Sequence, residues 1–532
     1  MALREASPLD DGLPRQRRKV AVVGAGVAGL QAARALQALP DVDVVIFERA
    51  EDIGGVWREN YLGFGAQVPR EQYSFPELGT SSSVLDWYPS GPQLQSHCVT
   101  YLESFGLRSA LRLATEVMRL RPLGDGRWLL ASRRLGAEAE VGDVEEEVFD
   151  FVALAVGGFS RKFVPEVPGS ANFRGLRLHS AELLDVSAIA GRRVVVIGAG
   201  KSALDCLAAA AKHAEVATLV VRTPVWILPQ KFLGIPFRFL ASTRWFADLV
   251  FPPYYDAGWF RLFLGYVWMP FQALLWLFFP PILWLHFAFL PRAMWPTKSL
   301  RWQLWHGHHL SICNIAAVRA MFRQPHVSCV RGPISRFDGE DLIVDDYLKG
   351  CQRRLLVDVV IFATGYREVW SALFDEKTRR ELDPNGEGPD LYRQILPTAD
   401  LPGLAFVGRV LSTTDIVSSF VQAQWLAHVV AGAVRTPPPA ERRHNSECYR
   451  AWRRSFLPTT SSTFIAVPRV HSYLDELIAD MQPKSASQRL FALPGRFWSS
   501  LFPLRANNYM APPGACKDDM PWVAGYGAMN GG

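Results

Sequence analysis

The stretch that decides the fold is Val20-Ala21-Val22-Val23-Gly24-Ala25-Gly26-Val27-Ala28-Gly29. The apolar run at residues 20–23 predicts a short buried parallel strand, and residues 30–39 after the glycines predict a helix. A second strand is predicted at residues 42–47, and it ends in Glu48. This order of strand, glycine turn, helix, strand and acid is typical of the first unit of a dinucleotide-binding domain.

The glycines and the acid also indicate which dinucleotide binds. Gly24 permits the tight turn, Gly26 lets a pyrophosphate approach the helix N-terminus, and Gly29 allows helix and strand to pack closely. Glu48 follows nineteen residues after Gly29, where its carboxylate can accept hydrogen bonds from both hydroxyls of an unmodified ribose. A phosphorylated ribose would be repelled there, so the motif predicts FAD or NAD.

The same plan recurs later with the opposite charge. Strands are predicted at residues 193–197 and 216–221, and between them lies Gly198-Ala199-Gly200-Lys201-Ser202-Ala203, the start of a helix over 204–212. Gly198, Gly200 and Ala203 form a G-x-G-x-x-A turn, and Ser202 is a candidate for further phosphate or ribose contact. Arg222 ends the second strand, where a guanidinium can pair with a 2′-phosphate. We therefore expect NADPH at this second site.

Composition narrows the class of protein. A chain of 532 residues, 49% hydrophobic and 20% charged, is expected to form two or three domains and not a disordered chain. A net charge of +6 with scattered basic residues gives no indication of nucleic-acid binding. Seven dispersed cysteines without a C-x-x-C argue for a reducing compartment and against a disulfide reductase. The first twenty residues lack an apolar signal region, so we expect an intracellular protein.

Further motifs carry a resemblance to a known family. Phe47-Glu48 continues to Gly54-Gly55-Val56-Trp57, an F-E-x5-G-G-x-W pattern. An F-x-G-x-x-x-H pattern runs from Phe173 to His179, and A-T-G-Y stands at Ala363-Thr364-Gly365-Tyr366. Over roughly residues 18–430 the chain resembles the class B flavin-dependent monooxygenases, which comprise the flavin-containing monooxygenases and their Baeyer–Villiger relatives.

The resemblance implies an α/β fold of two Rossmann-like dinucleotide-binding domains, with an NADP domain inserted into a discontinuous FAD domain. The expected boundaries are 18–160 for the first part of the FAD domain, 161–356 for the NADP domain with an apolar insertion at about 245–300, 357–435 for the second part, and 436–532 for a C-terminal extension. Gly55, Val56 and Trp57 are expected beside FAD. Gly157, Thr364 and Gly365 are expected at the hinges and next to the cofactors, and His179 in the linker.

The implied activity is NADPH- and O2-dependent oxygenation of a small substrate through a C4a-(hydro)peroxyflavin. In the family's N-oxygenating members an asparagine of an N-x-P-K setting lies beside the flavin, and Gln67-Val68-Pro69-Arg70 takes that place here. Gln67 is therefore the candidate catalytic residue. Leu183 replaces an expected aromatic residue, and Val156 an expected threonine.

These departures leave the substrate class open. Oxygenation of a soft nitrogen or sulfur is favoured, with Baeyer–Villiger oxygenation of a ketone as the alternative. A membrane-associated FAD and NADPH oxidase, or a binding protein without oxygenase turnover, is a further alternative.

Residues 262–290 are dense in Trp, Phe and Leu and carry no Asp, Glu, Lys or Arg. Pro270, Pro280 and Pro281 are expected to interrupt any single helix, so a hairpin dipping into a membrane is the first interpretation. The wall of a substrate tunnel is the second, and a homodimer interface the third. The first interpretation implies a lipophilic substrate that enters from the bilayer. The expected location is the cytoplasmic face of a membrane, with the cytoplasm as the alternative. A second interfacial helix is expected at residues 490–504. No metal site is expected at His306, His308 and His309.

Overall fold

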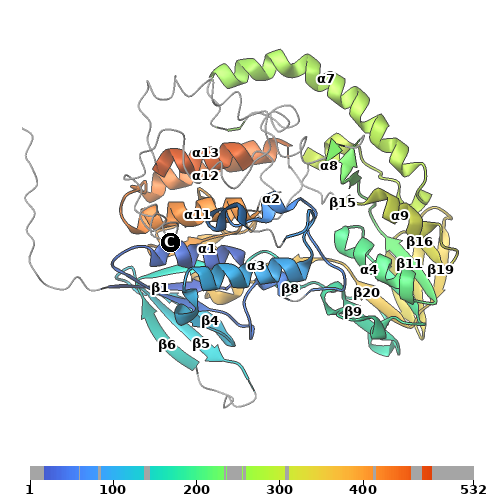
Figure 1. Cartoon of the computed structure of the whole chain (residues 1–532), viewed down its shortest axis with the longest axis horizontal. Coiled ribbons are helices and arrows are strands. Elements are labelled where there is room, and N and C mark those ends of the chain that lie inside the picture. The colour runs from blue at the N-terminus through green and yellow to red at the C-terminus, as the bar shows by residue number, and fades with distance from the viewer. Residues whose placement is uncertain are drawn as a thin grey trace, which may run out of the picture.

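The computed structural model describes residues 17–58, 60–81, 85–136, 144–232, 235–236, 254–255, 259–305, 311–410, 415–456 and 470–481. They form two α/β layers side by side, joined by short crossovers and flanked by a long helix (Figure 1). The predicted interfacial helix at 490–504 and the histidines at 306–309 lie outside the described residues.

The first sheet is five-stranded and parallel, in the order β24-β7-β1-β2-β3. Its strands are β1 (Arg18–Val23), β2 (Val42–Phe47), β3 (Leu111–Arg112), β7 (Phe151–Leu154) and β24 (Leu404–Phe406). Helix α1 (Val27–Gln37) connects β1 to β2. The predicted strand, helix and strand therefore all form, because a parallel strand buried on both faces needs an uninterrupted apolar run.

The second sheet repeats this plan in the order β16-β11-β10-β20-β9. Its strands are β9 (Leu176–His179), β10 (Arg193–Ile197), β11 (Val216–Val221), β16 (Val327–Arg331) and β20 (Val359–Phe362). Helix α4 (Lys201–His213) follows β10. The sheet is wholly parallel, and two such domains confirm the predicted fold class.

One predicted domain boundary needs correction. We expected the second part of the FAD domain to begin at residue 357, but β20 pairs with β10 and β9 and completes the second sheet. The chain crosses back only after this strand, at Thr364 and Gly365. The reason is that 359–362 is fully buried, and an interior position between β10 and β9 gives that apolar run strand partners on both sides.

Two short strands make the crossovers into a ribbon. β8 (Arg161–Lys162) and β21 (Tyr366–Arg367) pair antiparallel, with Tyr366 opposite Lys162. The segment that leaves the first sheet and the segment that returns to it thus run side by side in opposite directions. Gly157 (φ +65°) and Gly365 (φ +87°) flank this ribbon in left-handed backbone, which glycine adopts without strain.

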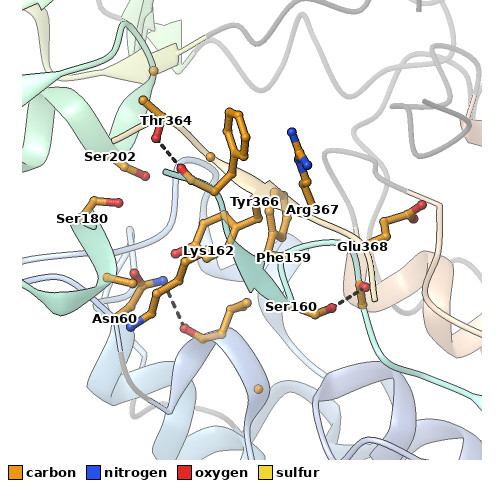
Figure 2. Close-up of a pocket in the computed structure, with 18 of the residues that line it drawn as sticks. Asn60, Phe159, Ser160, Lys162, Ser180, Ser202, Thr364, Tyr366, Arg367 and Glu368 are labelled. Atoms are coloured by element: carbon orange, nitrogen blue, oxygen red, sulfur yellow. Dashed lines mark hydrogen bonds between the residues drawn. The ribbon is translucent and has the colours of Figure 1, made fainter. Parts of the chain in front are cut away.

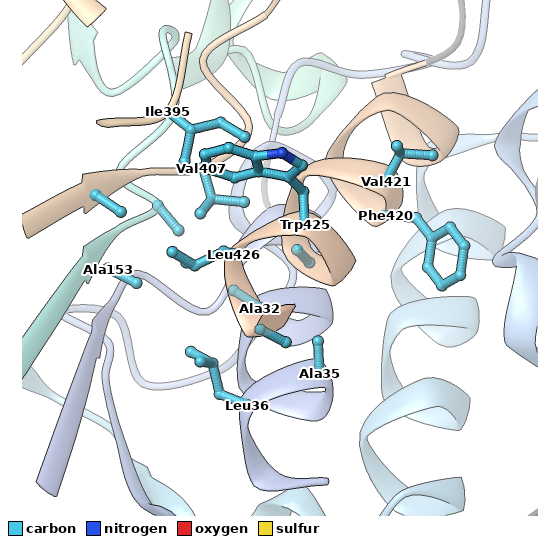
Figure 3. Close-up of a cluster of buried hydrophobic side chains, with 14 of the residues drawn as sticks. Ala32, Ala35, Leu36, Ala153, Ile395, Val407, Phe420, Val421, Trp425 and Leu426 are labelled. Atoms are coloured by element: carbon cyan, nitrogen blue, oxygen red, sulfur yellow. The ribbon is translucent and has the colours of Figure 1, made fainter. Parts of the chain in front are cut away.

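The core of the first half lies between its sheet and two helices (Figure 3). Ala32, Ala35 and Leu36 of α1 face Trp425 and Leu426 of α11 (Asp415–Val430), and all five are buried. Small side chains on α1 let the two helices approach closely. The same buried cluster includes Leu474 and Leu477 of α13 (Val470–Met481), so this part of the predicted C-terminal extension belongs to that core.

Helix α7 (Trp259–Phe287) corrects another expectation. It continues through Pro270, Pro280 and Pro281 as one helix, although we expected these prolines to force a hairpin. Each proline removes one backbone hydrogen bond and bends the helix, and Figure 1 shows α7 curving along the edge of the molecule. Bending the helix costs less free energy than breaking it, because a break would leave several backbone N–H and C=O groups of an apolar segment without hydrogen bonds.

The remaining elements frame these layers. Antiparallel sheets are formed by β4 (Thr115–Pro122), β5 (Trp128–Arg134) and β6 (Val144–Phe149), and by β17 (Ile334–Asp338), β18 (Asp341–Asp346) and β19 (Cys351–Leu356). Shorter strand pairs are β12 (Ile227–Pro229) with β15 (Ser311–Cys313), β13 (Lys231–Phe232) with β14 (Ile235–Pro236), and β22 (Leu391–Tyr392) with β23 (Leu396–Pro397). Further helices are α2 (Arg70–Tyr73), α3 (Gly91–Ser104), α8 (Leu300–Trp305), α9 (Ile315–Phe322), α10 (Glu376–Leu382) and α12 (Pro439–Phe456).

Candidate dinucleotide and oxygenation site

A single cavity of about 2450 Å³ lies between the two halves, and both glycine turns open onto it. The crossover ribbon forms one wall, where Phe159, Lys162 and Tyr366 gather between the two layers (Figure 2). Parallel α/β sheets bind ligands at the carboxyl ends of their strands. Here two such ends face one another across a shared space.

The first turn has the geometry that its glycines predict. Gly24 has φ +105°, and a Cβ there would lie 2.6 Å from the carbonyl oxygen of Ala155. A Cβ on Gly29 would lie 1.8 Å from the carbonyl oxygen of Gly24, so this glycine sits at a contact between helix and turn. By contrast, a Cβ on Gly26 would meet nothing closer than 3.7 Å. The space beside Gly26 is therefore left for a ligand at the N-terminus of α1.

Glu48 stands beside this turn. Its carboxylate accepts hydrogen bonds from the backbone N–H groups of Ala25, at 2.7 Å, and Ala50, at 2.9 Å. These bonds orient the side chain, and a carboxylate keeps further acceptor capacity for two ribose hydroxyls. Glu48 lines the cavity, as the prediction for an unphosphorylated ribose requires.

The second turn repeats the arrangement with one difference. Gly198 has φ +150°, and a Cβ there would lie 2.5 Å from the carbonyl oxygen of Ala363. A Cβ on Gly200, at the N-terminus of α4, would meet nothing within 4 Å. Arg222 follows β11, is exposed and lines the cavity. Its position at the strand end corresponds to that of Glu48 in the first unit, with the charge reversed.

Gln67 lies where the two halves meet. Its side-chain oxygen accepts a hydrogen bond of 3.1 Å from the backbone N–H of Ile312, in β15 on the far side of the cavity. Because the oxygen is engaged, the amide NH2 is the end that can donate to a ligand. Nearby, Trp57 stacks on Phe64 with ring centroids 6.0 Å apart and meets Tyr73 edge-on at 5.4 Å.

Tyr61 joins the halves, and sequence reasoning missed it. It is buried in the core cluster of the second half, although it follows β2 and the first glycine motif. Its hydroxyl hydrogen-bonds Ser202 and Asp205 of α4, and Asp205 forms an ion pair with Lys201. Burial raises the pKa of Asp205, an effect that the Lys201 ammonium opposes. The one signal in the sequence was the aromatic spacing of Trp57, Tyr61 and Phe64.

His179 closes the linker motif onto the returning chain. Its Nδ1 accepts from the backbone N–H of Ala181 at 3.3 Å, so its Nε2 carries the proton and donates to the carbonyl oxygen of Gly365 at 2.9 Å. Its ring meets Tyr366 edge-on at 4.9 Å. Burial lowers the pKa of His179. A neutral imidazole with both nitrogens engaged suits the predicted linker role.

The structure brings most predicted site residues to the cavity wall. Those that line it are Gly24, Gly26, Glu48, Gly55, Val56, Trp57, Gln67, Gly157, Gly198, Gly200, Ser202, Arg222, Thr364 and Gly365. Gly29 and Ala203 lie behind the turns instead, at helix–strand contacts. Lining residues that were not predicted include Asn60, Lys162, Tyr366 and His471. Asn60 stands in a loop, Lys162 and Tyr366 in the two-residue strands β8 and β21, and His471 in α13. No periodic sequence pattern marks these positions.

The donor set fits FAD and NADPH. Two helix N-termini with free space beside Gly26 and Gly200 suit two pyrophosphates. Glu48 matches an unmodified ribose, and Arg222 matches a phosphorylated one. Fold and site therefore define a flavoprotein oxidoreductase with two dinucleotide sites.

Comparisons with known proteins give the same class. Residues 17–250 match the family of flavin-binding monooxygenase-like proteins. A probable flavin-containing monooxygenase of Arabidopsis thaliana is 26% identical over 79% of this chain and 83% of its own length. A Baeyer–Villiger monooxygenase of Streptomyces coelicolor is 36% identical over 40% of this chain and 39% of its own length.

Solved structures share the fold. Cyclohexanone monooxygenase from Rhodococcus sp. Phi1, bound to NADP+, has a TM-score of 0.63 at 19% identity, over 88% of this chain and 99% of that one. OTEMO in complex with FAD and NADP has a TM-score of 0.65 at 17% identity, over 88% of this chain and 98% of that one. The likeness to the flavin-binding monooxygenase-like family thus rests on residues 17–250, and the comparisons bear out the predicted enzyme class, with FAD and NADPH as its cofactors.

Proposed function

We propose that this enzyme uses NADPH and O2 to oxygenate a soft nitrogen or sulfur centre of a small, lipophilic substrate. The observation that carries the proposal is the shared cavity, onto which Gly26, Gly200 and the Gln67 amide all open. When bound, the flavin accepts a hydride from NADPH and activates dioxygen. The protein's part is to bind both cofactors, orient them and exclude water.

Individual residues divide this work. The α1 and α4 N-termini hold the pyrophosphates, and Glu48 and Arg222 select the two ribose types. The NH2 group of Gln67, fixed through Ile312, donates a hydrogen bond at the oxygenating position. The ribbon of β8 and β21 lets the two halves adjust while NADP⁺ stays bound, with Gly157 and Gly365 as hinges.

Two observations favour heteroatom oxygenation over insertion into a ketone. The match to the flavin-containing monooxygenase extends over 79% of the chain, whereas that to the Baeyer–Villiger monooxygenase covers 40%. Gln67 also offers an amide in the place where the N-oxygenating members carry one. Baeyer–Villiger oxygenation remains the second candidate, since cyclohexanone monooxygenase shares the fold.

The test is turnover under ¹⁸O2 with methyl phenyl sulfide, N,N-dimethylaniline and cyclohexanone as separate probes. A labelled sulfoxide or N-oxide, with NADPH consumed in equal amount, is the expected result. A labelled lactone as the sole product would transfer the proposal to ketone oxygenation. NADPH oxidation that yields only hydrogen peroxide with all three probes would favour the oxidase alternative. The absence of any NADPH oxidation would favour a binding protein without turnover.

We also propose that the chain works at the cytoplasmic face of a membrane, held by the apolar segment 262–290. In support, residues Met269–Phe287 form one helix with the length and hydropathy of a membrane segment, and only 17% of that stretch is buried. An apolar surface of this kind is costly to leave in water. Recovery of the whole enzyme in the soluble fraction of lysed cells, as a homodimer, would favour the dimer interface instead.

A further inference from the structure

Helix α7 has two unlike faces along its described length. Phe279, Leu283, Phe287 and, just beyond the helix, Leu290 are buried in the core of the second half. The other face is an exposed apolar stripe at helical spacing, 38–66% exposed at each position. The stripe consists of Val267, Phe271, Leu274, Phe278, Ile282, Leu285 and Phe289.

The chain around the stripe is basic. From residue 257 to residue 337 the sequence contains no Asp or Glu and eight Lys or Arg. Some of these cations lie against aromatic residues in or just after α7. The Arg319 guanidinium is 4.6 Å from the centre of the exposed Phe289 ring, two residues beyond the helix, and that of Arg301 is 6.0 Å from the Trp276 ring. Lys298 lies 5.2 Å from the Trp302 ring. An apolar stripe with cations and tryptophans beside it matches a lipid headgroup boundary.

Both ends of α7 are tied to the same body. Before the helix, the hydroxyl of Tyr254 donates to Glu476 of α13 at 3.0 Å. At its other end, Phe287 is wholly buried in the second core. A helix that crossed a bilayer would leave these two anchors on opposite sides, so α7 can meet a membrane only by lying in its plane.

The same region reaches the cavity. Phe279 of α7, together with Lys298 and Trp302, lines the space that holds both glycine turns. Lys298 is also exposed, so the cavity reaches the surface beside the stripe. A substrate dissolved in the outer part of a bilayer would meet this opening without passing through water.

We propose that α7 lies in the plane of an anionic lipid surface, with the stripe among the acyl chains and Lys298, Arg301 and Arg319 at the lipid phosphates. The inference rests on the proposed membrane association and names the partner as bilayers that carry negatively charged headgroups. A juxtamembrane cation is attracted by such a surface, and salt screens the attraction. The substrate would accordingly be an amphiphile drawn from the lipid layer beside the opening.

The test is flotation of the FAD-loaded full chain with vesicles of phosphatidylcholine, alone or mixed with phosphatidylglycerol. We expect binding to the mixed vesicles, weakened by salt, and little binding to the neutral ones. Phe271→Ser/Phe278→Ser should abolish binding, and Lys298→Gln/Arg301→Gln should remove the preference for anionic vesicles. Phe271 and Phe278 do not line the cavity, so Phe271→Ser/Phe278→Ser should keep its flavin spectrum.

Val144→Ser/Val148→Ser is the matched control, because both valines are exposed on β6, away from α7. Equal binding to neutral and anionic vesicles would overturn the proposal that the partner surface is anionic. A wild-type dimer in the absence of lipid that Phe271→Ser/Phe278→Ser converts to a monomer, with no vesicle binding, would assign the stripe to a second copy. Because flotation needs no turnover, a failure here is distinct from a failure of the monooxygenase proposal.

Discussion

The backbone N–H of Ile312 donates a hydrogen bond of 3.1 Å to the side-chain oxygen of Gln67. The two residues lie 245 positions apart and come from opposite sides of the shared cavity. The bond fixes which end of the amide faces a ligand, so Gln67 is oriented by the half of the molecule that binds the second nucleotide.

Gln67→Ala is therefore expected to raise the hydrogen peroxide released per NADPH consumed, because the amide donor at the oxygenating position is lost. FAD content should be unchanged. Gln67→Asn, whose shorter side chain keeps an amide but cannot reach as far, should give an intermediate ratio. The measurement is peroxide yield against NADPH oxidation, and an unchanged yield in Gln67→Ala would remove this residue from the oxygenating site.

Arg222→Ala should raise the KM for NADPH with little change for NADH. A hydrogen bond to a charged group contributes about 2 kcal/mol, which corresponds to a roughly thirtyfold rise in KM. Arg222→Lys should fall between, since an ammonium keeps the charge but loses the planar fork. Steady-state kinetics with both nucleotides provide the check, and equal losses for NADPH and NADH would contradict the assignment.

Two glycines of the second turn should respond differently to alanine. A Cβ on Gly200 meets nothing within 4 Å, whereas one on Gly198 would lie 2.5 Å from the Ala363 carbonyl oxygen. Gly200→Ala should keep its melting temperature and FAD content but bind NADP⁺ at least about tenfold more weakly, through lost approach to the pyrophosphate. Gly198→Ala should lower the melting temperature. Undiminished NADP⁺ binding by Gly200→Ala would show that no pyrophosphate approaches there.

Tyr61→Phe tests the link between the halves. It removes only the hydroxyl that bonds Ser202 and Asp205 of α4, while the ring stays in its apolar surroundings. We expect NADP⁺ affinity to fall about fivefold, on the order of one buried hydrogen bond, with FAD content unchanged. Titration of the flavin spectrum with NADP⁺ measures this. Tyr61 and Asp205 should act together, so the double variant with Asp205→Asn should lose less NADP⁺ affinity than the sum of the two single losses. Additive losses would show that the two side chains do not support one another.

The sequence predicted the parts of the site that depend on local backbone. Gly24, Gly29 and Gly198 stand where any side chain would clash. Gly24 and Gly198 precede a helix and Gly29 lies in the first turn of one, so strand, turn and helix can be deduced from a few neighbouring residues. Glu48 and Arg222 can be located in the same way, because each is the first residue after a predicted strand. Confirmed elements such as β2, β10 and β11 match the predicted residues to the position.

Contacts between distant segments could not be predicted. Tyr61 enters the second core, and β20 joins the second sheet, because tertiary partners complete their burial. The single helix α7 was also missed. Proline rules describe a helix in isolation, whereas α7 is held by Leu283 and Phe287 in the core of the second half.

The buried His97 predicts how stability depends on pH. His97 lies in α3, and its Nε2 accepts a hydrogen bond of 3.2 Å from the backbone N–H of Phe75. Burial lowers its pKa from 6.5 to about 4. Protonation would bury a charge and place two N–H donors against one another, so the folded state does not take up the proton that the unfolded state binds. The stabilising contribution of neutral His97 to the free energy of unfolding is therefore complete above pH 6.5, and it declines as the pH falls to about 4.

The expected result is a melting temperature that drops more steeply over this window in the wild-type enzyme than in His97→Gln, which cannot be protonated. His213→Gln, at an exposed position near the end of α4, is the matched control and should keep the wild-type slope. Parallel slopes for the wild type and His97→Gln would mean that His97 is not the group that takes up the proton on unfolding.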